Sequence, residues 1–133
     1  MRQKLSRPPT RSVTISRPEG EVSYTLSALP LGYSQYLESV YPAPTMVLNG
    51  EPVPDNAKMG LWRLDVNCLC LAKALGDEME STAPTTGGRD AWATHARSVR
   101  DEFDAAGLTD GELGDLATAL GGVIRGTAAL GKA

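Results

Sequence analysis

The feature that most constrains the fold is a wide apolar arc on one predicted helix, between residues 57 and 80. Apolar residues recur there at helical spacing in two neighbouring stripes, which predicts an α-helix. Because a helix with so wide an apolar face must contact several neighbours, we expect the remaining elements to pack around it. The first stripe comprises Leu61, Leu64, Cys68, Leu71, Leu75 and Met79, and the second comprises Met59, Trp62, Val66 and Leu69.

Two further helices are predicted after this one. Residues 89–106 carry apolar side chains at a period of about 3.6 residues, and Gly107 ends the pattern. The segment Thr109–Glu112 matches a capping box, in which the Thr hydroxyl and the Glu carboxylate satisfy each other's free backbone amides. It opens a predicted helix over residues 110–128. The apolar positions of the earlier helix are Trp92, Ala96, Val99, Phe103 and Ala106.

The N-terminal part of the chain predicts strands. RSVTIS and EVSYTL alternate apolar and polar residues, and RPEG joins them as a turn with Pro at its second and Gly at its fourth position. These segments predict a β-hairpin over residues 12–26. Residues 1–11 are basic, contain a Pro-Pro pair and offer little to bury, so we expect a disordered arm.

A short helix and a proline-rich connection are predicted between the hairpin and the long helix. The helix covers residues 31–41 and ends before Pro42. In residues 42–56, Asn49-Gly50 suits a tight turn, so this connection forms either a second small hairpin or a structured loop. The residues aligned on one helical face are Tyr33, Tyr36, Leu37 and Val40.

The whole pattern predicts an α+β fold that is mostly α. We expect one domain over residues 12–129, with an N-terminal hairpin followed by about four helices. A chain of 133 residues is long enough for one such domain and too short for two.

Charge is unevenly distributed along the chain. The net charge is −3, yet residues 1–18 hold five basic residues and no acidic one. This arm is either a solvated tail or a contact for nucleic acid or an acidic partner. No apolar run approaches the roughly 20 residues of a membrane span, and the N-terminus lacks the apolar core of a secretory signal. We therefore expect a cytoplasmic protein.

Residues that carry chemistry are few and scattered. His95, the only histidine, lies at the border of an apolar stripe, and the sequence suggests no partner that would orient its ring. Cys68 and Cys70 are two positions apart on a helix, so they point to different faces and are expected to be free thiols. We expect no enzyme activity, no cofactor and no metal site.

The four tyrosines of the chain all lie between residues 24 and 41. Tyrosine buries apolar area while its hydroxyl tolerates water, which suits an adaptable binding surface. The other interpretation is that these rings only pack the hairpin against the helices. The residues predicted to bind a partner are Tyr33, Tyr36, Leu37, Tyr41, Met46, Val47 and Leu48.

Small residues recur every four positions on the last predicted helix. Glycine weakens a helix but lets another backbone approach closely, so this row predicts close helix packing or self-association. The alternative is a frayed C-terminus. The row comprises Gly114, Thr118, Gly122 and Gly126.

The stretch YTLSALPLGYSQYLESVYPAP, followed by helices and by GLTDGELGDL, resembles phage tail assembly chaperones over residues 12–125. The resemblance implies a non-enzymatic protein that coats the tape-measure protein and keeps it soluble while tail tube subunits assemble around it. It also implies self-association, contact with the tail tube protein and absence from the finished particle.

Two other functions remain open from the sequence. One is a structural tail completion or connector protein, which would persist in the virion. The other is a small nucleic-acid-associated regulator that uses the basic arm, whose binding would depend steeply on salt.

Overall fold

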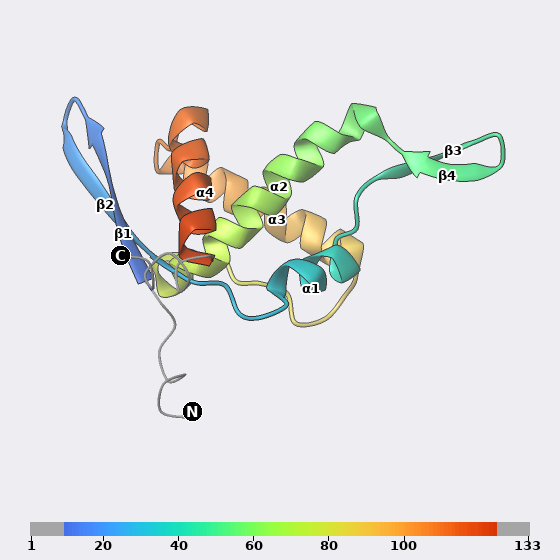
Figure 1. Cartoon of the computed structure of the whole chain (residues 1–133), viewed down its shortest axis with the longest axis horizontal. Coiled ribbons are helices and arrows are strands. Elements are labelled where there is room, and N and C mark those ends of the chain that lie inside the picture. The colour runs from blue at the N-terminus through green and yellow to red at the C-terminus, as the bar shows by residue number, and fades with distance from the viewer. Residues whose placement is uncertain (1–9, 125–133) are drawn as a thin grey trace.

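The chain forms an α+β domain in which one β-hairpin and four α-helices surround a single core and a second β-hairpin projects from it (Figure 1). The structure is a computed structural model and describes residues 10–124, and the predicted fold class is confirmed. The elements in chain order are β1 (Thr10–Arg17), β2 (Gly20–Ser27), α1 (Tyr33–Val40), β3 (Thr45–Leu48), β4 (Glu51–Pro54), α2 (Asn56–Leu75), η2 (Gly76–Glu78), α3 (Arg89–Ala105) and α4 (Asp110–Ile124).

Helix α2 is the centre of the domain, as its wide apolar arc predicts. It packs against α3, α4 and β2, while α1 lies below it in the view of Figure 1. Asp55 caps its N-terminus by accepting a hydrogen bond of 3.2 Å from the Ala57 N–H. The fully buried side chains of the core come from the hairpin and all four helices: Leu26, Leu37, Cys68, Leu69, Leu71, Val99 and Leu116.

Two predictions about α2 are corrected. The helix ends at Leu75 and not at residue 80, because Gly76 adopts a positive φ of 59° and turns the chain into η2. Met79 therefore lies beyond the helix, although its side chain still packs against the core. Leu61 was assigned to the core stripe but is 53% exposed. It lies in the N-terminal part of α2, which extends past the core toward the projecting hairpin (Figure 1).

The N-terminal hairpin lays one apolar face on the helices. β1 and β2 pair antiparallel with Arg17 opposite Gly20, so Pro18-Glu19 forms a two-residue turn. Ile15 and Leu26 are buried, whereas the opposite face carries serines and threonines that are mostly exposed. β1 begins at Thr10, so the predicted arm is shorter than residues 1–11; residues 1–9 lie outside the described residues.

A bidentate ion pair ties this hairpin to α4. Arg17 donates from Nε and Nη2 to the two carboxylate oxygens of Glu112, at 2.9 and 2.8 Å. Glu112 also completes the predicted capping box, since its carboxylate accepts from the Thr109 N–H at 2.9 Å and its own N–H donates to the Thr109 hydroxyl at 3.2 Å. One carboxylate thus starts a helix and anchors a hairpin.

The row of small residues on α4 faces outward where the structure describes it. Gly114 and Thr118 are exposed, and a Cβ placed on Gly114 would meet nothing within 4 Å. No other element of the described chain approaches this point closely. Gly126 and the predicted helical residues 125–128 lie outside the described residues.

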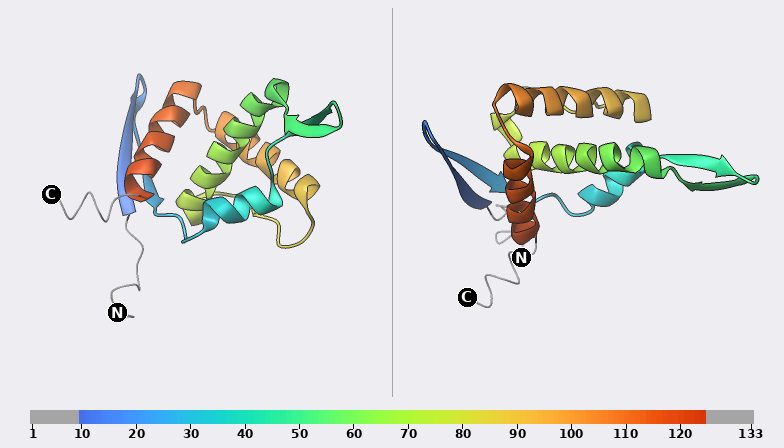
Figure 2. Two further views of the ribbon diagram at one scale, coloured as in Figure 1. Left: turned by 45° about the vertical axis from the view of Figure 1, so that its right-hand side comes forward. Right: turned by 90° about the horizontal axis from the view of Figure 1, so that it is seen from above.

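The proline-rich connection is a second hairpin. β3 and β4 pair antiparallel around Asn49-Gly50, which both have positive φ values, 54° and 81°. These values suit the primed turn that the sequence predicts. The hairpin extends away from the helices beyond the N-terminus of α2, as all three views show (Figures 1 and 2).

Candidate partner-binding surface

The residues predicted to form one binding surface divide into a buried group and an exposed group. Leu37 and Tyr41 are core residues, 1% and 5% exposed. Tyr33 is half-buried and Tyr36 is 49% exposed. The exposed group on the second hairpin comprises Met46, Val47 and Leu48, which are 46%, 73% and 55% exposed.

Tyr41 belongs to a buried polar network. Its hydroxyl donates to Asp65 Oδ2 at 2.6 Å, and its backbone carbonyl accepts from Trp62 Nε1 at 3.0 Å. The other Asp65 oxygen, Oδ1, lies 2.6 Å from Nε of Arg100. Burial and the hydrogen bond to Asp65 raise the pKa of Tyr41 to about 12. The network joins α1, α2 and α3, so this tyrosine holds the helices together and is not available to a partner.

Asp65 was missed by the sequence reasoning, although a signal was present. It lies between Leu64 and Val66 on the apolar side of α2 and is 2% exposed. An acidic residue on an otherwise apolar helical face must be neutralised or paired when it is buried. The sequence could therefore have predicted a buried partner, but not that it would be Tyr41 and Arg100.

Tyr33 and Tyr36 begin a row of rings that runs onto α3. The ring centroids of Tyr33 and Tyr36 are 6.3 Å apart, Tyr36 meets Trp92 edge-on at 5.9 Å, and Trp92 meets His95 edge-on at 5.6 Å. Such arrangements stabilise aromatic pairs beyond the area they bury. Tyr36 thus helps fix α1 against α3, and its outer part remains free for another contact.

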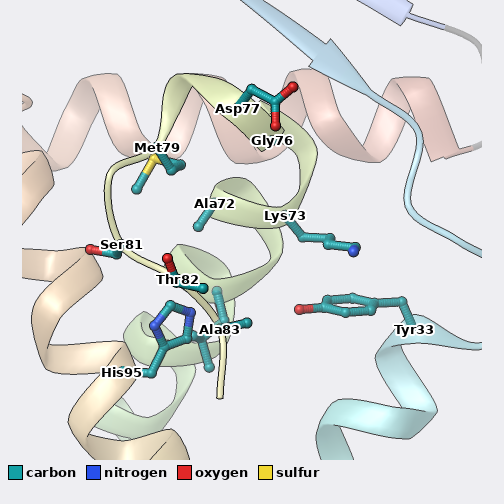
Figure 3. Close-up of a pocket in the computed structure, with 11 residues that line it drawn as sticks. Tyr33, Ala72, Lys73, Gly76, Asp77, Met79, Ser81, Thr82, Ala83 and His95 are labelled. Carbon is teal, nitrogen blue, oxygen red and sulfur yellow. The ribbon is translucent and has the colours of Figure 1, made fainter. Parts of the chain in front are cut away.

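A shallow hollow of about 330 Å³ lies between α1, α2 and the segment that follows η2 (Figure 3). Tyr33, Lys73, Thr82 and His95 are among the side chains around it. Lys73 Nζ lies 5.7 Å from the centre of the Tyr33 ring, and burial raises the pKa of Tyr33 to about 12.

His95 is the residue of this hollow best suited by its side-chain chemistry to acid–base catalysis. It is only 8% exposed, and burial lowers the pKa of its ring, which favours the neutral form. Within residues 10–124, His95 makes no side-chain hydrogen bond that would orient its ring. Its edge-on contact with Trp92 gives it a packing role.

The cysteines are free thiols, as predicted from their spacing. Cys68 is buried and Cys70 is half-buried, and burial raises the pKa of both, that of Cys68 to about 11. Their low acidity disfavours the nucleophilic thiolate. Within the described part of the chain, no three His, Cys, Asp or Glu side chains come together in a group that could hold a metal ion.

The second hairpin is the most exposed apolar feature of the described residues. β3 and β4 contact each other far more than they contact the helices. Pro52 and Pro54 on β4 are exposed and Val53 is half-buried, so apolar side chains line both faces of this hairpin. We call the exposed side chains of Met46, Val47 and Leu48 the hairpin surface. Contiguous exposed apolar residues are typical of interaction sites, so the hairpin surface is the candidate site of this molecule.

Comparison with protein-family models, curated proteins and solved structures finds no match for this chain. Among residues 10–124, no helix is both long and apolar enough to cross a membrane.

Proposed function

We propose that this protein is a phage tail assembly chaperone that acts by binding other polypeptides. It binds the tape-measure protein and keeps it soluble in the host cytoplasm while tail tube subunits assemble around it. In this proposal the chain makes and breaks no covalent bond.

The hairpin surface is the single observation that carries the proposal. Val47 is 73% exposed and lies between Met46 and Leu48, which are about half exposed, on a hairpin that extends from the body of the domain. Exposing apolar side chains to water is unfavourable, so a segment that does so is explained by a contact made outside this chain. Methionine adds an unbranched, adaptable side chain of the kind that suits varied apolar partners.

The rest of the described surface supports a binding role over a catalytic one. In the hollow of Figure 3, His95 packs against Trp92, and the Ser81 hydroxyl donates to Glu102 at 2.7 Å. General acid–base catalysis needs a base that a neighbouring group orients toward its substrate. His95 and Ser81 therefore make structural contacts, and Lys73 lies over the Tyr33 ring.

Co-expression with the tape-measure protein of the same phage tests the proposal. We expect the tape-measure protein to be found in the soluble fraction when this chain is present and in the pellet when it is absent. Equal insolubility in both cases would contradict the proposed function. Presence of this chain in purified virions would instead favour a structural tail protein.

A further inference from the structure

The register of the second hairpin determines which backbone groups face outward. Hydrogen-bonded and outward-facing positions alternate along an antiparallel pair, and a two-residue turn places a hydrogen-bonded pair next to it. Here that pair is Leu48 with Glu51. At the other end, the Asp55 N–H donates to the Pro44 carbonyl at 3.0 Å, which agrees with the same alternation. Even-numbered residues of β3 therefore bond to β4, and odd-numbered residues point away from it.

The two outer edges of this hairpin differ. On β3 the outward-facing residues are Thr45 and Val47, which keep a free N–H and C=O because β3 has no strand on this side within the described chain. On β4 the outward-facing residues are Pro54, which pairs with Thr45, and Pro52, which pairs with Val47. Proline has no N–H to donate and blocks the addition of a strand. A further strand can therefore be added at the β3 edge, whereas the prolines disfavour its addition at the β4 edge.

We propose that the open β3 edge pairs antiparallel with the β3 edge of a second copy of this chain. The two hairpins then form one continuous sheet in the order β4-β3-β3-β4. Placing Thr45 opposite Val47 of the other copy lets the outward groups of both residues form hydrogen bonds in both chains. Met46 then lies opposite its own counterpart at the two-fold axis. Because each hairpin has a single open edge, the assembly closes at two copies.

Three properties of β3 favour a second copy as the occupant of this edge. Its sequence, Thr-Met-Val-Leu, carries no charge, so antiparallel self-pairing brings no like charges together. An isolated two-stranded hairpin is marginal in water and gains stability from additional strands. Self-pairing also joins the apolar faces of two hairpins into a larger surface. Since the strands are short, the contact is smaller than in a stable dimer, and we expect reversible, concentration-dependent association.

Cross-linking tests the register directly. In the proposed pairing Met46 and its counterpart form a non-hydrogen-bonded pair, with Cβ atoms about 4.5–5.5 Å apart, within reach of a disulfide. Met46→Cys should give a disulfide-linked dimer on mild oxidation. Val53→Cys, on β4 opposite Met46 in the same chain, is the matched control and should remain monomeric, with the wild-type chain giving the background from Cys68 and Cys70. Equal cross-linking of both variants overturns the proposal.

Sedimentation over a range of concentrations tests the edge itself. Val47→Pro removes an outward N–H but no bond to β4, so it should raise the dimer dissociation constant about tenfold or more; Val47→Thr, which keeps that N–H, should not. Replacing both Pro52 and Pro54 with Val opens the second edge and should produce species larger than dimers. A wild-type chain that is monomeric at every concentration contradicts the proposal. A Val47→Pro chain whose dimer dissociation constant equals that of wild type also contradicts the proposal, whether or not the variant loses client binding.

Discussion

At the scale of single residues, the structure assigns the tyrosines to different roles. Tyr41 is buried and bonded to Asp65, and Tyr24 packs at the edge of the core. Tyr36 meets Trp92 edge-on, and Tyr33 lies beside Tyr36. Of the two interpretations left open by the sequence, packing accounts for Tyr41. Apart from Tyr36, which is about half exposed, the exposed members of the predicted binding set are Met46, Val47 and Leu48 on the second hairpin.

The Asp65 network should be the most sensitive polar site of the domain. Replacing Arg100 with Met leaves a buried carboxylate without its cation and should lower the free energy of unfolding by about 3 kcal/mol. Tyr41→Phe removes one buried hydrogen bond and should cost about 1–2 kcal/mol. Urea denaturation at neutral pH measures both. Arg97→Met, at an exposed position of the same helix, should change the free energy by less than about 0.5 kcal/mol.

At the scale of elements, the contact between the first hairpin and α4 should make stability depend on pH. The pKa of Glu112 is lowered from 4.5 to about 2, chiefly by its hydrogen bonds with Arg17 and also by the Thr109 N–H. Because the folded pKa is below the unfolded one, this stabilisation is present above about pH 4.5 and is lost as pH falls toward 2.

The matching prediction compares wild type with Glu112→Gln, which mimics the protonated carboxyl. Wild type should be more stable than the variant at pH 7, and the difference should shrink as the pH falls from about 5 to 2. Urea denaturation at several pH values gives this difference, and Arg17→Met should show the same loss. A constant difference between wild type and Glu112→Gln at all pH values would show that the ion pair does not cause the effect.

Two glycines near the start of α4 should respond oppositely to alanine. Gly107 has φ 80° just after α3, where a side chain is strained, so Gly107→Ala should lower the free energy of unfolding by about 1 kcal/mol or more. Gly114 is inside α4 with open space around it, so Gly114→Ala should raise it by up to about 1 kcal/mol. Thermal or urea unfolding measures both. If Gly114→Ala abolished self-association, the interface would be the α4 face predicted from the row of small residues and not the β3 edge.

At the scale of the whole molecule, local patterns predicted the elements well. Apolar periodicity located α2, α3 and α4, alternation located the first hairpin, and Thr109–Glu112 located a helix start, because each signal depends on neighbours in sequence. The end of α2 at Leu75 was missed because Gly76 changes direction only through its backbone conformation. The sequence does not decide between a hairpin and a loop for residues 42–56, because their prolines argue against strands unless the register places them at outward positions.

The candidate surface could be predicted only in part. Met46, Val47 and Leu48 were named from their place in a proline-rich connection, and the structure exposes all three. Burial of Leu37 and Tyr41 depends on contacts with α2 and α3, which are distant in sequence. Local spacing cannot distinguish a tyrosine on a binding surface from one bonded to a buried carboxylate.

The most direct test of the proposed function combines the hairpin surface with the client. In the variant Met46→Thr, Val47→Thr, Leu48→Thr, β-branched threonine preserves the strand while removing apolar surface. Leu31→Thr, at a fully exposed leucine before α1, is the matched control. With the tape-measure protein co-expressed, we predict that wild type and the Leu31 variant keep it soluble and that the hairpin variant does not. A folded hairpin variant that keeps the tape-measure protein as soluble as wild type does would contradict the account.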